Sequence, residues 1–312
     1  MAFGRRWPLA ATAALALALL GAGLSWMAGT QLVSSTPRAV ALPVDFSARP
    51  VSLPLPANRT VEGWFVPGAG KGAILLLHGI RADRRQMLDR ARFLAASGYA
   101  VLLIDLPGQG ASRAPFITFG LREADGVQAA LAWLQDQAPG QPLGLVGVSL
   151  GAASFVLCKT CPRVDAVVLE SMYPTIEEAV EDRLRMRAGI LARPLSKLLL
   201  WQLPLRLDIA PHELRPIDAM AGLRMPLLVA AGDRDLHTTI AETRRIFAAA
   251  PEPKVLWEVR GAAHVDLHRF AGQAYEDRIE RFFADSFRSR GTQQGSTAGE
   301  GGAPGMAVLQ TR

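Results

Sequence analysis

The chain has 312 residues, of which 50% are hydrophobic and 20% charged, and its formal net charge is +6. This apolar content excludes an intrinsically disordered chain, and the length suits one α/β domain of about 250 residues. Basic and acidic residues are interspersed and no nucleic-acid-binding module is recognisable, so we expect no nucleic-acid partner. Two cysteines and five histidines show no metal-ligand spacing, so we expect no metal and no cofactor.

The N-terminal segment is apolar over the length of a membrane helix. Arg5 and Arg6 precede a stretch without charge that extends to Pro37, with a Leu/Ala-rich centre at residues 9–28. A bilayer core is crossed by about 20 helical residues. We therefore predict a membrane anchor or signal segment at residues 1–30.

An uncleaved anchor is favoured over a cleaved secretory signal. Trp26 and Met27 interrupt any small-x-small cleavage site after the apolar stretch. Arg5 and Arg6 should keep the N-terminus cytoplasmic, so the rest of the chain should lie outside the cell membrane. Secretion after signal cleavage is the alternative. A Pro-rich linker is predicted at residues 31–48.

Eight short apolar runs predict the strands of one sheet. They occupy residues 51–55, 61–66, 73–77, 100–104, 143–146, 166–169, 227–230 and 255–259. In the second half of the chain they alternate with helical patterns, which is typical of a doubly wound α/β sheet. We place this domain at residues 49–288 and a disordered, Gly/Gln/Ser/Thr-rich tail at residues 289–312.

The strand predicted at residues 73–77 is followed by His78-Gly79-Ile80-Arg81. A loop at this place commonly supplies an oxyanion donor from the backbone N–H just past the His-Gly pair, so we assign this donor to Ile80. His78 should support the loop. Arg81 is either solvated or binds an anionic part of the substrate. A solvated helix face is expected for the basic residues of this region, which are Arg81, Arg84, Arg85, Arg90 and Arg92.

The pentapeptide Gly147-Val148-Ser149-Leu150-Gly151 lies between a strand and an Ala-rich helical stretch. A nucleophile elbow needs this order, because the turn strains the serine backbone and the flanking glycines avoid a clash. The turn exposes the serine Oγ, and the backbone N–H of Leu150 can stabilise an oxyanion. An ordinary Gly-rich turn is the alternative.

Cys158 and Cys161 end the helix that follows the elbow. In a redox fold this spacing would indicate disulfide exchange. At the end of a helix it favours a structural role, and outside the cytoplasm the pair could oxidise.

Residues 171–225 are predicted to form a helical cap. The cap contains a strongly apolar run at residues 198–207. This run either packs the cap onto the core, or forms an acyl-chain pocket or a membrane-facing lid.

Two acids follow the serine in the chain order that a hydrolase requires. Asp233 and Asp235 come directly after an apolar strand that ends at Gly232. One should orient a histidine through Nδ1, and the other should be a turn residue.

Four histidines also follow the serine. His264 lies just after the last predicted strand and can turn back over Ser149. His268 is the second choice, while His212 and His237 have the positions of ordinary surface residues.

Together these landmarks resemble the α/β-hydrolase superfamily, in a subgroup similar to serine aminopeptidase-like and esterase-like hydrolases. They are His78-Gly79, Asp105-x-x-Gly108-x-Gly110-x-Ser112, the serine elbow, Gly232-x-x-Asp235 and Gly261-x-x-His264. The acid of that family stands three places after the glycine, so the resemblance selects Asp235. It spans most of the chain and implies a mostly parallel eight-stranded sheet, flanked by helices and carrying a cap.

The resemblance implies a Ser-His-Asp hydrolase acting on a small acyl substrate. Ser149 would attack the carbonyl while His264 takes its proton and Asp235 stabilises the imidazolium. The N–H groups of Ile80 and Leu150 would hold the oxyanion. A carboxylic ester is the favoured substrate, with amide or thioester cleavage as variants of the same chemistry. A non-catalytic binding protein on this fold is the other class, and no oligomeric state is predicted.

Overall fold

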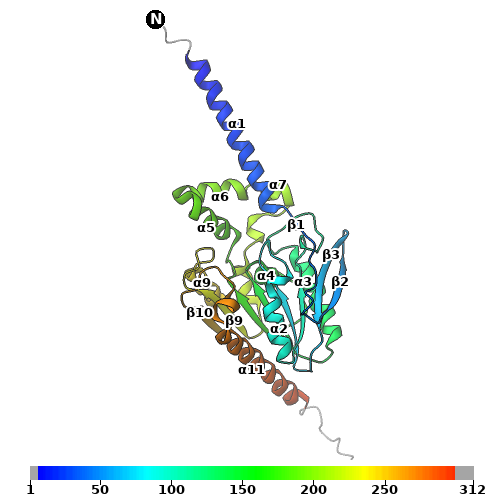
Figure 1. Cartoon of the computed structure of the whole chain (residues 1–312). Coiled ribbons are helices and arrows are strands. Elements are labelled where there is room, and N and C mark those ends of the chain that lie inside the picture. Colours follow the sequence, from blue (N-terminus) through cyan, green and yellow to red (C-terminus); the bar gives the residue numbers. More distant parts are fainter. Residues whose placement is uncertain (1–5, 299–312) are drawn as a thin grey trace, which may run out of the picture.

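The computed structural model describes residues 6–298 (Figure 1). The main strands are β2 (Arg49–Leu55), β3 (Arg59–Val66), β4 (Ala73–Leu77), β5 (Ala100–Ile104), β7 (Leu143–Val148), β8 (Ala166–Glu170), β9 (Leu227–Gly232) and β10 (Lys254–Val259). They form one sheet in the order β10-β9-β8-β7-β4-β5-β3-β2. The pairs from β10 to β5 are parallel, whereas β3 is antiparallel to both β5 and β2. The predicted fold class, a mostly parallel eight-stranded α/β sheet, is confirmed.

Helices cover both faces of the sheet. They are α2 (Leu88–Ala96), α3 (Glu123–Gln137), α4 (Leu150–Val156), α9 (Ile240–Ala249), α10 (Leu267–Ala271) and α11 (Gln273–Ala298). Side chains alternate between the two faces along each strand. In β4, Leu75 and Leu77 pack with α3, α4 and α9, whereas Ile74 and Leu76 pack with α2 and α11. This double layer explains why β4 is apolar and buried throughout.

The segment predicted as the cap is helical. It contains α5 (Ile176–Ala188), α6 (Ala192–Leu200), α7 (Leu203–Leu207) and α8 (Pro216–Ala219), with 3-10 turns at Gly189–Leu191, Pro211–Glu213 and Met220–Gly222. Thr175 caps α5 by accepting a hydrogen bond from the backbone N–H of Glu178. Apolar side chains of α5, α6 and α7 form a separate cluster that includes Val180, Leu200 and Leu207. The cap therefore has a small core of its own.

Helix α1 (Arg6–Val33) projects from the domain beside α6 and α7, whereas α11 extends from the opposite end (Figure 1). Its segment Ala10–Val33 contains a window with a mean hydropathy of 1.7 that is 0% buried. The helix is long and apolar enough to cross a membrane, and a secretory signal near an N-terminus can meet the same criteria. It ends three residues beyond the boundary predicted at residue 30.

The predicted linker lies against the domain. Val40 and Phe46 are buried in the cluster that contains Trp64. Between α1 and these contacts, β1 (Thr36–Pro37) pairs in parallel with β6 (Gln109–Gly110). Two-residue strands are too short to show a period in the sequence.

The C-terminal boundary also differs from the prediction. Helix α11 continues to Ala298, although the tail was expected from residue 289. Once a helix has formed, each added residue gains a hydrogen bond, which outweighs the low helix propensity of Gly and Ser here. Residues 299–312 of the predicted tail lie outside the described residues.

Candidate active site

Ser149 forms a strained turn between β7 and α4. Its φ is +50° and its ψ is −108°, and its backbone N–H donates to the carbonyl oxygen of Glu170 at 2.7 Å. Both flanking glycines are required by close approach. A Cβ on Gly147 would lie 2.7 Å from the backbone of Ala152, and a Cβ on Gly151 would lie 2.6 Å from a carbonyl oxygen of β4. The geometry is that of the predicted elbow.

Asp235 and His264 are in direct contact. His264 Nδ1 lies 2.7 Å from Asp235 Oδ2. The other carboxylate oxygen of Asp235 accepts the backbone N–H groups of His237 at 2.8 Å and Thr238 at 3.0 Å. Asp233 instead accepts the backbone N–H of Gly261 at 2.7 Å. Of the two candidate acids, the structure brings Asp235 to the histidine and leaves Asp233 in a turn.

These contacts keep Asp235 ionised. Burial by itself would raise the pKa of Asp235, but the hydrogen bond and charge of His264 and the two backbone N–H groups lower the pKa below its ordinary value. An ionised carboxylate is a hydrogen-bond acceptor only, so Nδ1 of the ring carries the hydrogen and donates it to Asp235. Nε2 of His264 is then the ring nitrogen that is free to act as a base.

His237 is not the ordinary surface residue predicted from the sequence. Its ring stacks on that of His264 with centroids 4.7 Å apart, and it lines the same cavity as Ser149. Burial, and after it the charge of His264, lowers the pKa of His237, which favours the neutral ring. No motif marks this contact, because it joins two loops through tertiary packing.

The two other histidines lie elsewhere. His212 is exposed within a 3-10 turn. His268, the second choice for the base, is buried on α10 and its Nε2 lies 2.8 Å from Glu276 Oε1. Neither contacts Asp235.

Two glutamines hold the loop that contains Ile80. Gln86 Oε1 accepts the backbone N–H of Gly79 at 2.8 Å, and Gln109 Oε1 accepts that of Arg81. Within residues 6–298, neither the N–H of Ile80 nor that of Leu150 has a protein acceptor. The two predicted oxyanion donors are therefore available, while the neighbours of Ile80 are fixed.

His78 supports this loop, as expected. Its Nδ1 lies 2.7 Å from the carbonyl oxygen of Gly79, and its Nε2 accepts the backbone N–H of Leu106 at 3.0 Å. Complete burial lowers the pKa of His78, which agrees with a neutral, structural ring.

A cavity of about 370 Å³ opens beside Ser149. Ile80 and Leu150 line its sheet side, and Val180 and Leu184 of α5 line its cap side. The lining is mainly apolar, which suits an acyl group, and it also includes Arg81, Arg183 and Arg187.

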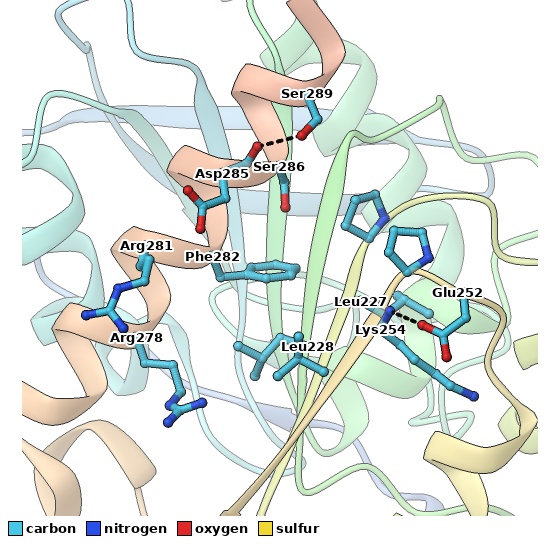
Figure 2. A pocket seen from close by; sticks show the side chains of 13 residues that line it. Leu227, Leu228, Glu252, Lys254, Arg278, Arg281, Phe282, Asp285, Ser286 and Ser289 are labelled. Atoms are coloured by element: carbon cyan, nitrogen blue, oxygen red, sulfur yellow. Dashed lines mark hydrogen bonds between the residues drawn. The ribbon is translucent and has the colours of Figure 1, made fainter. Parts of the chain in front are cut away.

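A second cavity, of about 390 Å³, lies between α11 and the first residues of β9 and β10, Leu227 and Lys254 (Figure 2). This is the amino end of the parallel strands. Open α/β sheets bind ligands outside the carboxyl ends of their strands. The smaller cavity at the elbow is therefore the candidate active site.

Comparison with known proteins agrees with this architecture. Residues 74–278 match the Alpha/beta hydrolase family. The chain belongs to this family. Two uncharacterized proteins from strains of Mycobacterium tuberculosis are 31% identical over 258 residues, which is 77% of this chain and 85% of theirs.

Solved α/β hydrolases share the fold. The esterase Pf2001 of Pyrococcus furiosus has a TM-score of 0.66 at 20% identity, covering 82% of this chain and 98% of its own. The α/β hydrolase GrgF of Penicillium has a TM-score of 0.62 at 18% identity, covering 78% and 100%. A thermophilic esterase of Thermogutta terrifontis has a TM-score of 0.57 at 16% identity, covering 78% and 100%.

In this α/β hydrolase a buried ion-pair network links the elbow to the histidine loop. Arg90 on α2 is 1% exposed and donates to Glu170 Oε2 at 2.7 Å and to both carboxylate oxygens of Asp266 at 2.9 Å. Its Nε also donates to the hydroxyl of Tyr275 at 2.9 Å. Glu170 accepts the N–H of Ser149, and Asp266 follows the histidine by two residues.

Arg90 and Arg84 are therefore not on the solvated face that the sequence predicted. Arg84 is also buried and donates to Asp105 Oδ2 at 2.9 Å. Their partners come from other elements, so the local charge pattern gave no sign of them.

Cys158 and Cys161 form a disulfide in the segment just after α4. Among the described residues, no group of three or more His, Cys, Asp or Glu side chains is arranged to bind a metal ion.

Proposed function

We propose that this α/β hydrolase is a serine hydrolase that cleaves carboxylic esters through an acyl-enzyme. The observation that carries the proposal is the contact of Asp235 with His264 Nδ1. It lies at the carboxyl end of the sheet, where the strained Ser149 lines a mainly apolar cavity. A carboxylate, an imidazole and a serine in these roles are the parts of general-base nucleophilic catalysis.

The reaction would proceed in two halves. His264 Nε2 takes the hydroxyl proton as Ser149 Oγ bonds to the acyl carbon, and the N–H groups of Ile80 and Leu150 stabilise the oxyanion. The imidazolium then gives its proton to the leaving alcohol. Water, activated by the same base, hydrolyses the acyl-enzyme and restores the serine.

The cavity favours an apolar acyl group, and the alcohol leaving group of an ester departs more easily than an amine. An amide-cleaving activity by the same mechanism is the second candidate. Helix α1 would act as a retained anchor, with Arg5 and Arg6 in the cytoplasm and the catalytic domain outside.

A fluorophosphonate probe tests this proposal on the full-length protein in mild detergent. We expect labelling of the wild type, no labelling of Ser149→Ala, and full labelling of the control Ser52→Ala, an exposed serine on β2. Parallel assays with p-nitrophenyl esters and aminoacyl-nitroanilides would choose between ester and amide cleavage. A folded wild type that fails to react would favour a binding protein instead.

A further inference from the structure

The outward face of the cap carries a continuous apolar ridge. Its members recur every three or four positions along α6, α7 and the residues that flank α6, and are 38% to 67% exposed; they are Leu191, Leu195, Leu198, Trp201 and Leu205. The opposite face of α6 is the buried one, formed by Ala192, Ser196 and Leu200. A surface helix of a soluble domain presents polar residues on its outer face. The apolar ridge therefore requires a partner.

Helix α1 is fixed to the same two cap helices. Gln202 Nε2 donates to the carbonyl oxygen of Ser25 at 3.1 Å and to its hydroxyl at 3.0 Å. The guanidinium of Arg206 donates to Thr30 Oγ1 at 2.9 Å and lies 3.9 Å from the ring centroid of Trp26. The orientation of α1 relative to the ridge is thus set by specific contacts.

The last turn of α1 also forms part of the active-site wall. Leu32 lines the cavity that contains Ser149. The guanidinium of Arg81, in the oxyanion loop, donates to the carbonyl oxygens of Gln31 and Leu32. Arg81 thus binds the end of α1. Cleavage of α1 as a signal segment would open the cavity, so the contacts favour a retained helix.

The spacing of two tryptophans along α1 matches a bilayer. Trp7 and Trp26 are nineteen residues apart, which is about 28 Å in an α-helix, close to the thickness of about 30 Å of the hydrocarbon core. Tryptophans gather at both membrane interfaces. With Trp26 at the outer interface, its partner Arg206 on α7 lies at the same depth. Figure 1 shows α6 lying across the axis of α1, as a helix in the membrane plane would.

We propose that the apolar ridge is embedded in the outer interface of the bilayer that α1 crosses, and that the substrate is a lipid ester that enters the cavity from this bilayer. The exposed Arg193 and Lys197 flank the ridge on α6, where they can bind anionic headgroups. Met186 of α5 is 45% exposed and also lines the cavity, so the cavity opens to the outside at the cap, where an acyl chain could enter. The substrate part of this inference rests on the proposed function.

A fluorophore on the ridge tests its position. The two native cysteines form a disulfide, so in Leu198→Cys the introduced thiol can be labelled selectively with bimane in full-length protein reconstituted into phosphatidylcholine/phosphatidylglycerol vesicles. Val44→Cys, at a fully exposed position of the segment before β2, is the control. We expect nitroxide-bearing lipids to quench the label at 198 and aqueous iodide to quench the label at 44. Quenching of both by iodide, or protection of 198 from both quenchers by a protein partner, would overturn the proposal.

Activity tests the entry of substrate. In Leu198→Asp/Trp201→Asp we expect hydrolysis of a long-chain diacyl ester in vesicles to fall by about tenfold, because acidic side chains are expelled from the bilayer. Hydrolysis of a soluble short-chain ester should be unchanged, and Val44→Asp should change neither. An equal loss on both substrates, or no loss on either, would contradict entry from the bilayer. A wild type without activity on any ester would refute the proposed function, and the quenching result would still decide where the ridge lies.

Discussion

Two neighbouring regions of the molecule are stabilised by opposite means. One is the carboxyl end of the sheet, where the candidate catalytic residues lie, and the other is the cap that covers it. At this end of the sheet, Arg90, Glu170, Asp266 and Tyr275 form a buried network of charge-assisted hydrogen bonds. The cap is held by an apolar cluster and exposes apolar side chains outward. Directional bonds fix positions, whereas apolar contacts tolerate rearrangement. We therefore expect the candidate site to be more rigid than the cap above it.

The largest expected effect tests the candidate site. Asp235→Asn should lower kcat on a soluble ester by about 10⁴-fold, because the amide would donate to Nδ1 and stabilise the wrong tautomer of His264. Asp233→Asn is the matched control, since an amide oxygen can still accept the N–H of Gly261. Similar losses in the two variants would show that Asp235 is not the orienting acid.

The next effect is on stability. Removing Arg90 leaves Glu170 buried without its partner, so Arg90→Ala should lower the free energy of unfolding by about 3–5 kcal/mol. Urea denaturation would measure it. Arg92→Ala, on the same helix, breaks an exposed pair with Asp45 and should have little effect. Equal effects of the two changes would mean that the network does not stabilise the fold.

A third prediction concerns the contact between cap and sheet domain. Glu242 on α9 and Asp182 on α5 are close enough for each carboxylate to affect the pKa of the other. Burial and the neighbouring carboxylate raise the pKa of Glu242 from an ordinary 4.5 to about 7. The folded state thus binds this proton more tightly, and stability should fall as pH rises from about 4.5 to 7.

Glu242→Gln removes the titration but keeps an oxygen that can accept the capping N–H of Thr239. We expect it to stabilise the protein at pH 8 by about 1–3 kcal/mol and to flatten the pH dependence. Glu213→Gln, which changes an exposed glutamate with the same capping role, is the control. A pH profile of unfolding that is unchanged in Glu242→Gln would refute the raised pKa of Glu242.

The smallest expected effect tests whether the cap residues that line the cavity bind the acyl chain of the substrate. Val180 is buried and lines the cavity, so Val180→Phe should reduce its volume and lower activity on long-chain relative to short-chain esters by about tenfold. Val255→Phe, which enlarges a residue lining the cavity beside α11, should leave chain-length preference unchanged. A preference that is the same in both variants would place the acyl chain elsewhere.

The buried strands were the most predictable part of this fold. Residues 73–77 and 100–104 are strands with the predicted limits, because runs of apolar residues buried on both faces leave an unmistakable pattern. The antiparallel strands β2 and β3 each begin two residues earlier than predicted, at Arg49 and Arg59. β2 is the edge strand, and the first residues of β3 pair with β2 alone. Charged residues are tolerated there, so the hydrophobic pattern underestimates the length of both strands.

The candidate site was predictable where turn chemistry determines it. The glycines around Ser149 follow from a local constraint that is visible in sequence, whereas Asp235 was selected over Asp233 by family resemblance. Gln86, Gln109 and His237 were missed because their roles depend on contacts between segments far apart in the chain. The contacts of α1 with the cap were missed for the same reason. The apolar pattern of a helix predicts its length but not the residues that it contacts.

The backbone strain described at the elbow has a consequence for evolution. Of the seven non-glycine residues with positive φ among those the structure describes, Arg81, Phe119 and Ser149 line the cavity. Such conformations cost of order 1–3 kcal/mol each. Glycine would adopt the backbone of Ser149 without that cost, so Ser149→Gly should give an inactive protein that is harder to unfold than the wild type. Stability alone would therefore favour glycine at this position, whereas the proposed function requires the strained serine.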